Sequence, residues 1–411
     1  MVLYEEFTLK NGLRVLVHED PSTPMVAVNV LYDVGARDEH PEQTGFAHLF
    51  EHLMFGGSIN IPQYDTPLQR VGGENNAFTS NDITNYHITL PAVNIETALW
   101  LESDRMLGLA FNEKSLEVQR NVVIEEFKQR YLNQPYGDVW LKFRPLAYQA
   151  HPYQWATIGK ELSHIEQAKM EDVSAFFDKH YQPANAILTI AGDVKTSDVK
   201  VLCEKWFEQI PSRPVPPRQL PPEPKQQEAR RLTVQAPVPN NSLYIAFHGV
   251  NRLHESYYAM DLITDLLSRG TSSRMYRVLV KEQALFSEVN AYITGSIDPN
   301  LVVTEGKPLP GISMEVAEEA LWEQLERLKE VEISPEELDK VKNKTESLLA
   351  FSELSILDKA MNLGYFKLLN EPERINKEAE YYQSVTSKDL QALSKELFRK
   401  ENSSTLLYLA S

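Results

Sequence analysis

The sequence predicts an α+β protein with two homologous domains, each a mainly antiparallel sheet with helices packed on it. The chain has 411 residues, 42% of them hydrophobic, which suits two or three globular domains of roughly 100–200 residues each. Seven prolines fall within residues 211–227, so this stretch should be an extended, stiff connector. Similar strand and helix patterns occur on both sides of it. We therefore expect domains at 1–210 and 228–411.

The first half alternates between strand and helix patterns. Residues 6–19 form two alternating runs around Asn11-Gly12, which is a strong hairpin signal. A helix is predicted at 44–57, from an N-cap at Thr44 to a stop at Gly56-Gly57. The other elements expected here are strands at 25–35, 76–91 and 184–194, and helices at 92–110, 113–132 and 170–180.

The second half repeats the theme. Two strands are expected within residues 230–250, followed by a helix at 255–270 and two long helices at 314–331 and 335–350. The two halves share a pattern of predicted strands and helices, but their amino-acid sequences do not match. The pattern indicates an internal duplication.

Charge and composition exclude several classes of function. The chain has 41 Lys and Arg against 58 Asp and Glu, a net charge of −17, so nucleic acid is not an expected partner. Cys203 is the only cysteine, which rules out an internal disulfide and a cysteine-based metal site. No apolar run approaches the ~18 residues of a membrane span. The first twenty residues do not resemble a signal peptide, so we expect a cytoplasmic protein, or a periplasmic one if a leader has been removed.

The helix predicted at 44–57 carries the strongest chemical signal. It contains His48, Glu51 and His52 in the order H-x-x-E-H. Residues four apart share one face of a helix, so both imidazoles can reach one ion. The Glu51 carboxylate can then take a proton from a water on that ion. Such a short pattern also arises by chance, but two histidines and a glutamate in an otherwise apolar helix need a partner, and a zinc ion supplies one.

A catalytic zinc site uses three protein ligands and leaves one position for water. The helix predicted around 115–131 offers Glu125 and Glu126 as the third ligand. At ~100° per residue, Glu126 falls at the edge of the inward face and Glu125 points nearly opposite. Glu126 is therefore the predicted ligand, and solvated charges on an amphipathic helix are the alternative for both. The expected inward face consists of Leu116, Val122, Val123, Phe127 and Tyr131.

Five segments carry a resemblance to a known family. They are GFAHLFEHLMFGG (45–57), GGENNAFTSNDITNYHITLP (72–91), QRNVVIEEF (119–127), HPYQWATIGKELSHI (151–165) and LSRGTSSRMYRVLVKEQAL (267–285). With these segments in this order, the chain resembles the pitrilysin-type (inverzincin) zinc metallopeptidases, in the branch of bacterial and mitochondrial processing peptidases. The first segment, followed at the family's spacing by Glu126, is the most specific of the five signals.

The resemblance implies two domains that close as a clamshell around short or unfolded peptides. It also implies one Zn²⁺ per chain, with the two histidines of the motif and Glu126 as ligands and Glu51 as the general base. Asn76, Ala77 and Phe78 match the family's edge strand, which pairs with the substrate backbone. From the sequence alone, a plain hairpin edge is an equal alternative for this strand.

The second half departs from the family pattern. Active single-chain members carry an Arg and a Tyr, seven residues apart, that bind the substrate and the oxyanion. Val280 and Ser287 stand there in this chain, and a shift by one residue gives Leu279 and Phe286. Losing such a donor typically costs about 10²–10³ in rate.

These observations predict a zinc-dependent endopeptidase and the zinc-bearing subunit of a heterodimer. A paralogous partner would supply the Arg and Tyr, with a homodimer as the other arrangement. Arg274 or Arg277 is the in-chain candidate for the missing role. The alternative function is a non-catalytic structural or assembly subunit that keeps the fold, although an intact motif argues against it.

Overall fold

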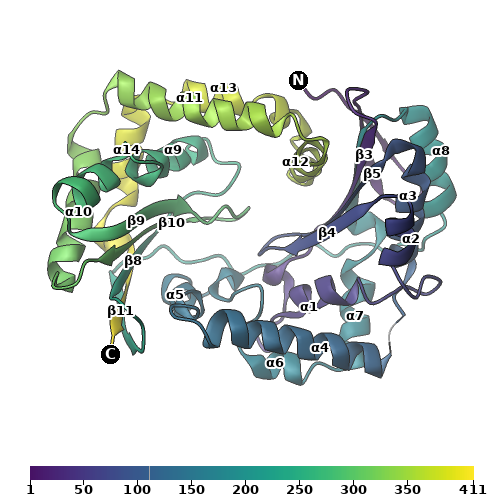
Figure 1. The fold of residues 1–411 in the computed structure, drawn as a ribbon, viewed down its shortest axis with the longest axis horizontal. Helices are drawn as coiled ribbons and strands as arrows, with labels where there is room; N and C mark the ends of the chain where they lie inside the picture. Colours follow the sequence, from purple (N-terminus) through teal and green to yellow (C-terminus); the bar gives the residue numbers. More distant parts are fainter. Residues whose placement is uncertain (111) are drawn as a thin grey trace. The chain divides into compact units, whose positions relative to one another are not determined.

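The computed structural model describes residues 1–110 and 112–411 and confirms the α+β fold class. Its first sheet has six strands, β1 (Glu5–Thr8), β2 (Arg14–Glu19), β3 (Met25–Tyr32), β4 (Glu74–Thr79), β5 (Thr84–Pro91) and β6 (Ala186–Gly192). They are arranged in the order β1-β2-β6-β3-β5-β4, which leaves β4 at one edge (Figure 1). The hairpin expected around Asn11-Gly12 is confirmed as the antiparallel pair β1 and β2.

The second sheet repeats the topology of the first. Its strands are β7 (Arg230–Ala236), β8 (Ser242–His248), β9 (Phe286–Ile293), β10 (Leu301–Pro308) and β11 (Ser403–Ala410), in the order β7-β11-β8-β10-β9. Counted from β4 and from β9, both sheets have three antiparallel pairings followed by one parallel pairing. This shared order is what an internal duplication produces.

Two compact units make up the chain, and they exchange segments. The first consists of Met1–Gln129, Trp155–Pro221 and Ala350–Lys377, and the second of Arg130–Gln154, Pro222–Leu349 and Glu378–Ser411. A helix from late in the chain therefore packs within the first unit, and a helix from the first half packs within the second. The predicted boundaries, 1–210 and 228–411, follow chain order and stay a prediction.

Helices cover both faces of the first sheet. They are α1 (Phe46–Leu53), α2 (Asp65–Arg70), α3 (Ile95–Leu107), α4 (Glu113–Phe127), α6 (Leu162–Glu166), α7 (Met170–His180), α8 (Thr196–Phe207) and α12 (Ile356–Leu368). α3 and α8 pack on one face and α12 on the other (Figure 1). Because both faces are covered, β3 is buried along almost its whole length.

Small residues let α12 approach the first sheet closely. Ala360 is fully buried in a cluster with Ala27 and Ala191 of the strands. One turn later, a Cβ on Gly364 would lie only 2.9 Å from the Oγ1 atom of Thr189. A larger side chain at either helix position would therefore move α12 away from the sheet.

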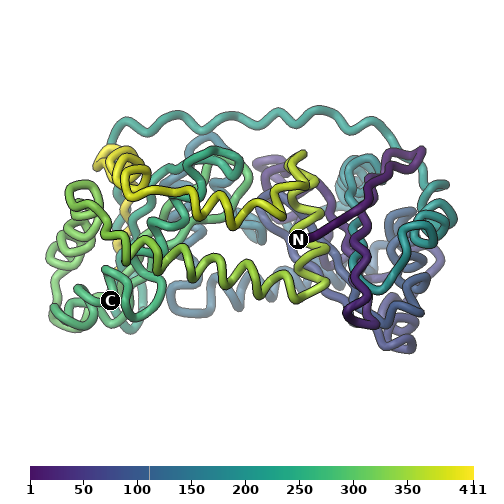
Figure 2. The backbone as a smooth tube through the Cα atoms, turned by 90° about the horizontal axis from the view of Figure 1, so that it is seen from above, coloured from purple at the N-terminus to yellow at the C-terminus, as the bar shows by residue number. Residues whose placement is uncertain are grey.

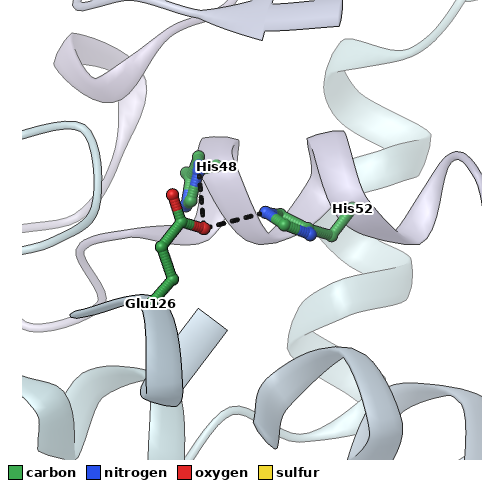
Figure 3. A group of neighbouring side chains, drawn as sticks. All are labelled: His48, His52 and Glu126. Carbon is green, nitrogen blue, oxygen red and sulfur yellow. Dashed lines mark ion pairs between the residues drawn. The ribbon is translucent and has the colours of Figure 1, made fainter. Parts of the chain in front are cut away.

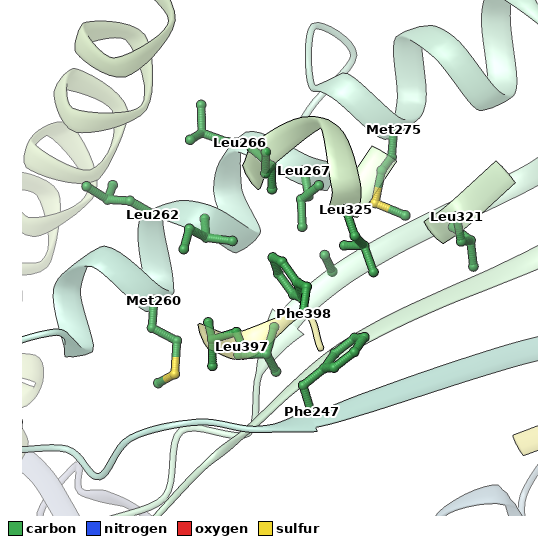
Figure 4. Close-up of a cluster of buried hydrophobic side chains, with 14 of the residues drawn as sticks. Phe247, Met260, Leu262, Leu266, Leu267, Met275, Leu321, Leu325, Leu397 and Phe398 are labelled. Carbon is green, nitrogen blue, oxygen red and sulfur yellow. The ribbon is translucent and has the colours of Figure 1, made fainter. Parts of the chain in front are cut away.

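The second unit also places helices on both faces of its sheet. They are α5 (Val139–Ala147), α9 (Tyr257–Ser268), α10 (Met314–Glu330), most of α11 (Pro335–Ser352), α13 (Glu378–Ser384) and α14 (Ser387–Leu397). Phe247 of β8 lies in the core formed with α9, α10 and α14 (Figure 4). Its neighbour Ala246 points to the other face and packs in the cluster that holds Phe143 of α5.

The connector at 211–227 contains no helix or strand, as its prolines predict (Figure 2). Its Arg218 guanidinium pairs with Asp33 (2.8 Å) and Asp38 (2.6 Å) of the first unit. Its Glu223 carboxylate accepts the backbone N–H of Gln149 in the second unit. The chain is thus tethered on both sides of the boundary between the units.

Among the described residues we find no helix with both the length and the apolarity needed to span a bilayer.

Candidate metal centre

The N-cap of helix α1 lies one residue later than the sequence predicts. It is Gly45 in the left-handed region (φ +89°), so the assignment of this role to Thr44 is wrong. The backbone N–H of Thr44 instead donates to Nδ1 of His164 (3.2 Å), and its Oγ1 accepts the N–H of Lys160 (2.8 Å). These bonds tie the segment before α1 to a distant part of the first unit.

A buried carboxylate fixes the first turn of α1. Glu39 accepts the backbone N–H of Gly45 (2.9 Å) and of Ala47 (2.8 Å), two of the amides that a helix leaves without internal partners. Burial raises the pKa of Glu39 to about 8, and these two hydrogen bonds act in the opposite direction. A Cβ on Gly45 would lie 2.6 Å from the carbonyl oxygen of Ile158, so only glycine fits there. Glu39 is not predictable from the sequence, because its distance from the helix matches no capping pattern.

The structure brings together the three predicted metal ligands. His48 and His52 lie one turn apart on α1 and face Glu126 of α4 (Figure 3). Glu126 Oε2 is 3.6 Å from Nε2 of His48 and 3.3 Å from Nε2 of His52. All three side chains are largely buried, with 12%, 25% and 17% exposed in the order His48, His52 and Glu126. Among the described residues, this is the only group of three or more His, Cys, Asp or Glu side chains with ligand atoms close enough to hold a metal ion.

These distances fit a zinc ion. In a tetrahedral site with bonds of about 2.0–2.1 Å, neighbouring ligand atoms lie roughly 3.3–3.4 Å apart. The separations of 3.3 and 3.6 Å from the Glu126 oxygen to the two ring nitrogens are close to that value. Two imidazoles and one carboxylate are also a donor set that catalytic zinc uses.

The structure separates the two candidate carboxylates of α4. Glu126 faces the imidazoles, whereas the Glu125 side chain is 61% exposed and pairs with Lys128 (2.7 Å). One detail of the predicted inward face is wrong, because Val122 is 45% exposed and Ile124 is buried. Because α4 contacts both α1 and α6, the buried face of the helix includes Ile124.

Glu51 lies on α1 between the two histidines in sequence and forms a hydrogen bond to the edge strand. Its Oε2 accepts the hydroxyl of Thr79, the last residue of β4, at 2.6 Å. Burial is the main cause that raises the pKa of the Glu51 carboxyl. This contact is not predictable from the sequence, because it joins residues 28 positions apart in different elements.

Asn76, Ala77 and Phe78 lie in the middle of β4. The strand pairs with β5, with Ala77 opposite Tyr86, and it is the last strand in the order of the first sheet. Exposed and half-buried side chains alternate along it, and Phe78 is 42% exposed. An edge strand of this kind can accept a further strand. The use of β4 for substrate stays a prediction.

In the second unit, the positions expected to hold Arg and Tyr are not part of a polar site. Val280 is half-buried against the core, and Ser287 lies at the exposed start of β9. Arg274 makes two hydrogen bonds to Glu337 (2.7 and 2.6 Å), and this carboxylate compensates the positive charge of the guanidinium group. Arg277 is the freer of the two, with 61% of its side chain exposed.

The fold and this cluster define a class, namely α+β proteins with a duplicated sheet and a His-His-Glu metal-site geometry in one copy. The model of the insulinase family (peptidase family M16) matches residues 14–151. The model described as the peptidase M16 inactive domain matches residues 167–345. The chain belongs to peptidase family M16, which supports peptidase activity in general.

Individual relatives agree with this family. A zinc protease of Helicobacter pylori, PqqE, is 31% identical over 410 residues, covering 98% of this chain and 92% of its own. A probable mitochondrial-processing peptidase subunit beta of Arabidopsis thaliana is 28% identical over 215 residues, covering 52% of this chain and 40% of its own. The crystal structure of a protease from Helicobacter pylori matches the whole chain at 30% identity, with a TM-score of 0.95 and full coverage of both chains. The resemblance inferred from the sequence is therefore confirmed, and the printed name of PqqE, a zinc protease, implies zinc for that relative.

The two glutamates of α4 give a direct test of the metal site. Replacing Glu126 with Ala removes one ligand atom and should weaken zinc binding by at least about 100-fold. Mutating a residue that only hydrogen-bonds to a metal ligand already lowers metal affinity by about 10–100-fold. Glu125→Ala is the matched control on the same helix and should keep zinc. Atomic absorption after dialysis against a weak chelator measures both. Zinc retained in Glu126→Ala and lost in Glu125→Ala would show that the wrong carboxylate was chosen.

Proposed function

We propose that the chain is a zinc-dependent endopeptidase whose catalytic centre lies in the first unit. His48, His52 and Glu126 are the proposed zinc ligands, and Glu51 is the proposed general base. The observation that carries the proposal is the Glu126 oxygen, which stands at tetrahedral ligand spacing from both imidazole nitrogens. Membership of a peptidase family supports the same reaction.

Zinc, when bound, polarises the scissile carbonyl and makes water a better nucleophile at neutral pH. The chain's own part begins with Glu51, whose carboxylate lies on the same helix as two of the ligands. In this position one carboxylate oxygen of Glu51 accepts a proton from the attacking water. Glu51 then delivers this proton to the leaving amine. Thr79 holds the other oxygen, Oε2, through its hydroxyl. Thr79 is thus a positioning residue, which fixes the direction in which Glu51 presents its free oxygen.

The edge strand β4 explains how the substrate is held. We assign Asn76, Ala77 and Phe78 to pairing with an extended peptide backbone, because they precede Thr79 on the strand that also orients Glu51. Main-chain pairing favours short or unfolded peptides over folded proteins, since a folded chain does not offer a free strand. We propose that the chain has domains at 1–210 and 228–411 and that the substrate is enclosed in a chamber, as the sequence resemblance implies.

The second unit supports an active site whose groups come from two chains. Val280 and Ser287 supply no cation or phenol, and Arg274 is committed to Glu337. The family model described as an inactive domain matches residues 167–345, a range that includes Val280 and Ser287. One relative is named as a subunit of a processing peptidase. We therefore propose a paralogous partner that supplies the Arg and Tyr, in a heterodimer or, with a second copy, a homodimer. A cytoplasmic location stays a prediction.

The role of Glu51 is tested by replacing it with Gln. The variant should keep stoichiometric zinc, because all three ligands remain, and should cleave an unstructured peptide about 10²–10⁴-fold more slowly, because the proton acceptor is gone. Zinc content and peptide cleavage are measured on the same preparation. Wild-type rates in Glu51→Gln would refute the general-base assignment. A wild-type chain purified without zinc would instead favour the assembly-subunit alternative.

Thr79 gives a test that separates positioning from catalysis. Thr79→Val keeps the shape of the side chain and removes the hydroxyl, so kcat should fall by about tenfold while KM and zinc content change little. Thr79→Ser keeps the hydroxyl and should restore most of kcat. If Thr79→Ser were as slow as Thr79→Val, the hydrogen bond to Glu51 would not be the cause.

The proposed partner is tested by titration. The purified chain alone should bind zinc and cleave peptides poorly, and activity should rise and saturate near equimolar partner, because the partner completes the set of oxyanion donors. Arg277→Ala should leave this stimulation unchanged. Full activity of the monomeric chain alone, lost on changing Arg277 to Ala, would favour an in-chain substitute for the missing Arg.

A further inference from the structure

A second site candidate lies wholly within the second unit and apart from the metal centre. It is a cavity of about 450 Å³ between the π-helical turn at Tyr276–Glu282, α10 and the start of α11. That volume falls in the range of small-molecule pockets. Its lining consists of Ser272, Arg274, Arg277, Val278, Gln324, Arg327, Val331, Ser334, Glu336, Glu337 and Lys340.

The lining is cationic in a chain that is strongly acidic overall. It has four basic side chains against two carboxylates, whereas the chain as a whole carries a net charge of −17. One carboxylate, Glu337, is already paired with Arg274. Neither Arg327 nor Lys340 forms an ion pair with any residue that the structure describes, and Lys340 donates instead to the backbone oxygen of Ser272. Arg277 pairs with Glu282 (3.6 Å), which lies outside the lining. Arg327 and Lys340 therefore bring to the cavity positive charge that no described carboxylate pairs with.

Gln324 is an independent sign of a ligand. Its residue is only 2% exposed, it lines the cavity, and its amide makes no hydrogen bond with any described group of the protein. Because the amide is not sealed in the core, its hydrogen-bonding groups open onto the cavity, where an oxygen of a bound anion can accept the amide N–H.

The start of α11 adds a third contribution. This helix has 18 residues, and Ser334, directly before it, accepts the backbone N–H of Glu337 at 3.3 Å. The amino end of a helix carries a partial positive charge, which favours anions. The field of the helix and the charges of Arg277, Arg327 and Lys340 thus act in the same direction.

We propose that this cavity binds a small molecule with two or more anionic groups, and that these groups are phosphates. The planar guanidinium group matches the oxygens of a phosphate in a two-pronged hydrogen bond, and the cavity offers two exposed guanidinium groups, on Arg277 and Arg327. The volume exceeds what a single phosphate fills. The proposal does not depend on the proposed peptidase function, since none of the lining residues belongs to the metal centre.

Calorimetry with defined probes on the full-length, zinc-loaded chain tests the site. Fructose 1,6-bisphosphate supplies phosphates, propane-1,2,3-tricarboxylate supplies carboxylates, and fructose supplies neither, all at constant ionic strength. The bisphosphate should bind once per chain with a Kd below about 1 mM, and fructose should not bind. Tighter binding of the tricarboxylate would keep an anion site and overturn the choice of phosphate. No saturable binding of either anion would overturn the site.

Two variants connect the binding to the cavity. Arg327→Gln removes an exposed cation and should weaken bisphosphate binding by at least about tenfold, and Gln324→Leu should also weaken it. Lys388→Gln makes the same change of net charge on an exposed residue of α14 outside the cavity and should bind as the wild type does. Equal weakening by Lys388→Gln and Arg327→Gln would show that only overall charge is sensed, and unchanged binding in Arg327→Gln would place the anion elsewhere.

Discussion

The structure of the first unit depends on one constraint, which is that a carboxylate from one helix must stand between two imidazoles of another. Glu126 meets both His48 and His52 within 3.6 Å, so α1 and α4 must be fixed to a fraction of an ångström. α1 is held at its start by Glu39 and at its middle by the hydrogen bond from Thr79 to Glu51. Placing three polar side chains in an apolar environment costs free energy unless an ion joins them. The precise packing of α1 against α4 and the proposed binding of a metal ion therefore depend on each other.

The duplicated sheet places different side chains at corresponding positions of its two copies. α1 lies between β3 and β4, and α9 occupies the corresponding place between β8 and β9. α9 carries Asp261 and Asp265 four residues apart, the spacing of the two histidines on α1. These carboxylates are used internally, since Asp261 accepts the hydroxyl of Tyr382 (2.6 Å) and Asp265 pairs with Arg269 (3.1 Å). The same scaffold position thus carries the proposed metal ligands in one unit and internally bonded carboxylates in the other.

The sequence predicts most of what is local and little of what is distant. Helical periodicity places the motif on one face of α1 and selects Glu126 over its neighbour, because both follow from 100° per residue. The duplication is visible as a repeated pattern. Glu39, Thr79 and the exchange of α5 and α12 between the units escaped prediction, since each depends on contacts between segments far apart in the chain. The error at Thr44 has the same origin, because a distant carboxylate satisfies the amides that a local cap would otherwise take.

X-ray absorption at the zinc K-edge of the purified full-length chain tests the central claim most directly. The arrangement of His48, His52 and Glu126 predicts a four-coordinate zinc with two imidazole nitrogens and light oxygen ligands at about 2.0–2.2 Å, and no sulfur. The imidazole signal should fall by half in His52→Ala if any zinc remains. A spectrum with sulfur at about 2.3 Å, or with no imidazole signal, would contradict the assignment of this cluster as the zinc site.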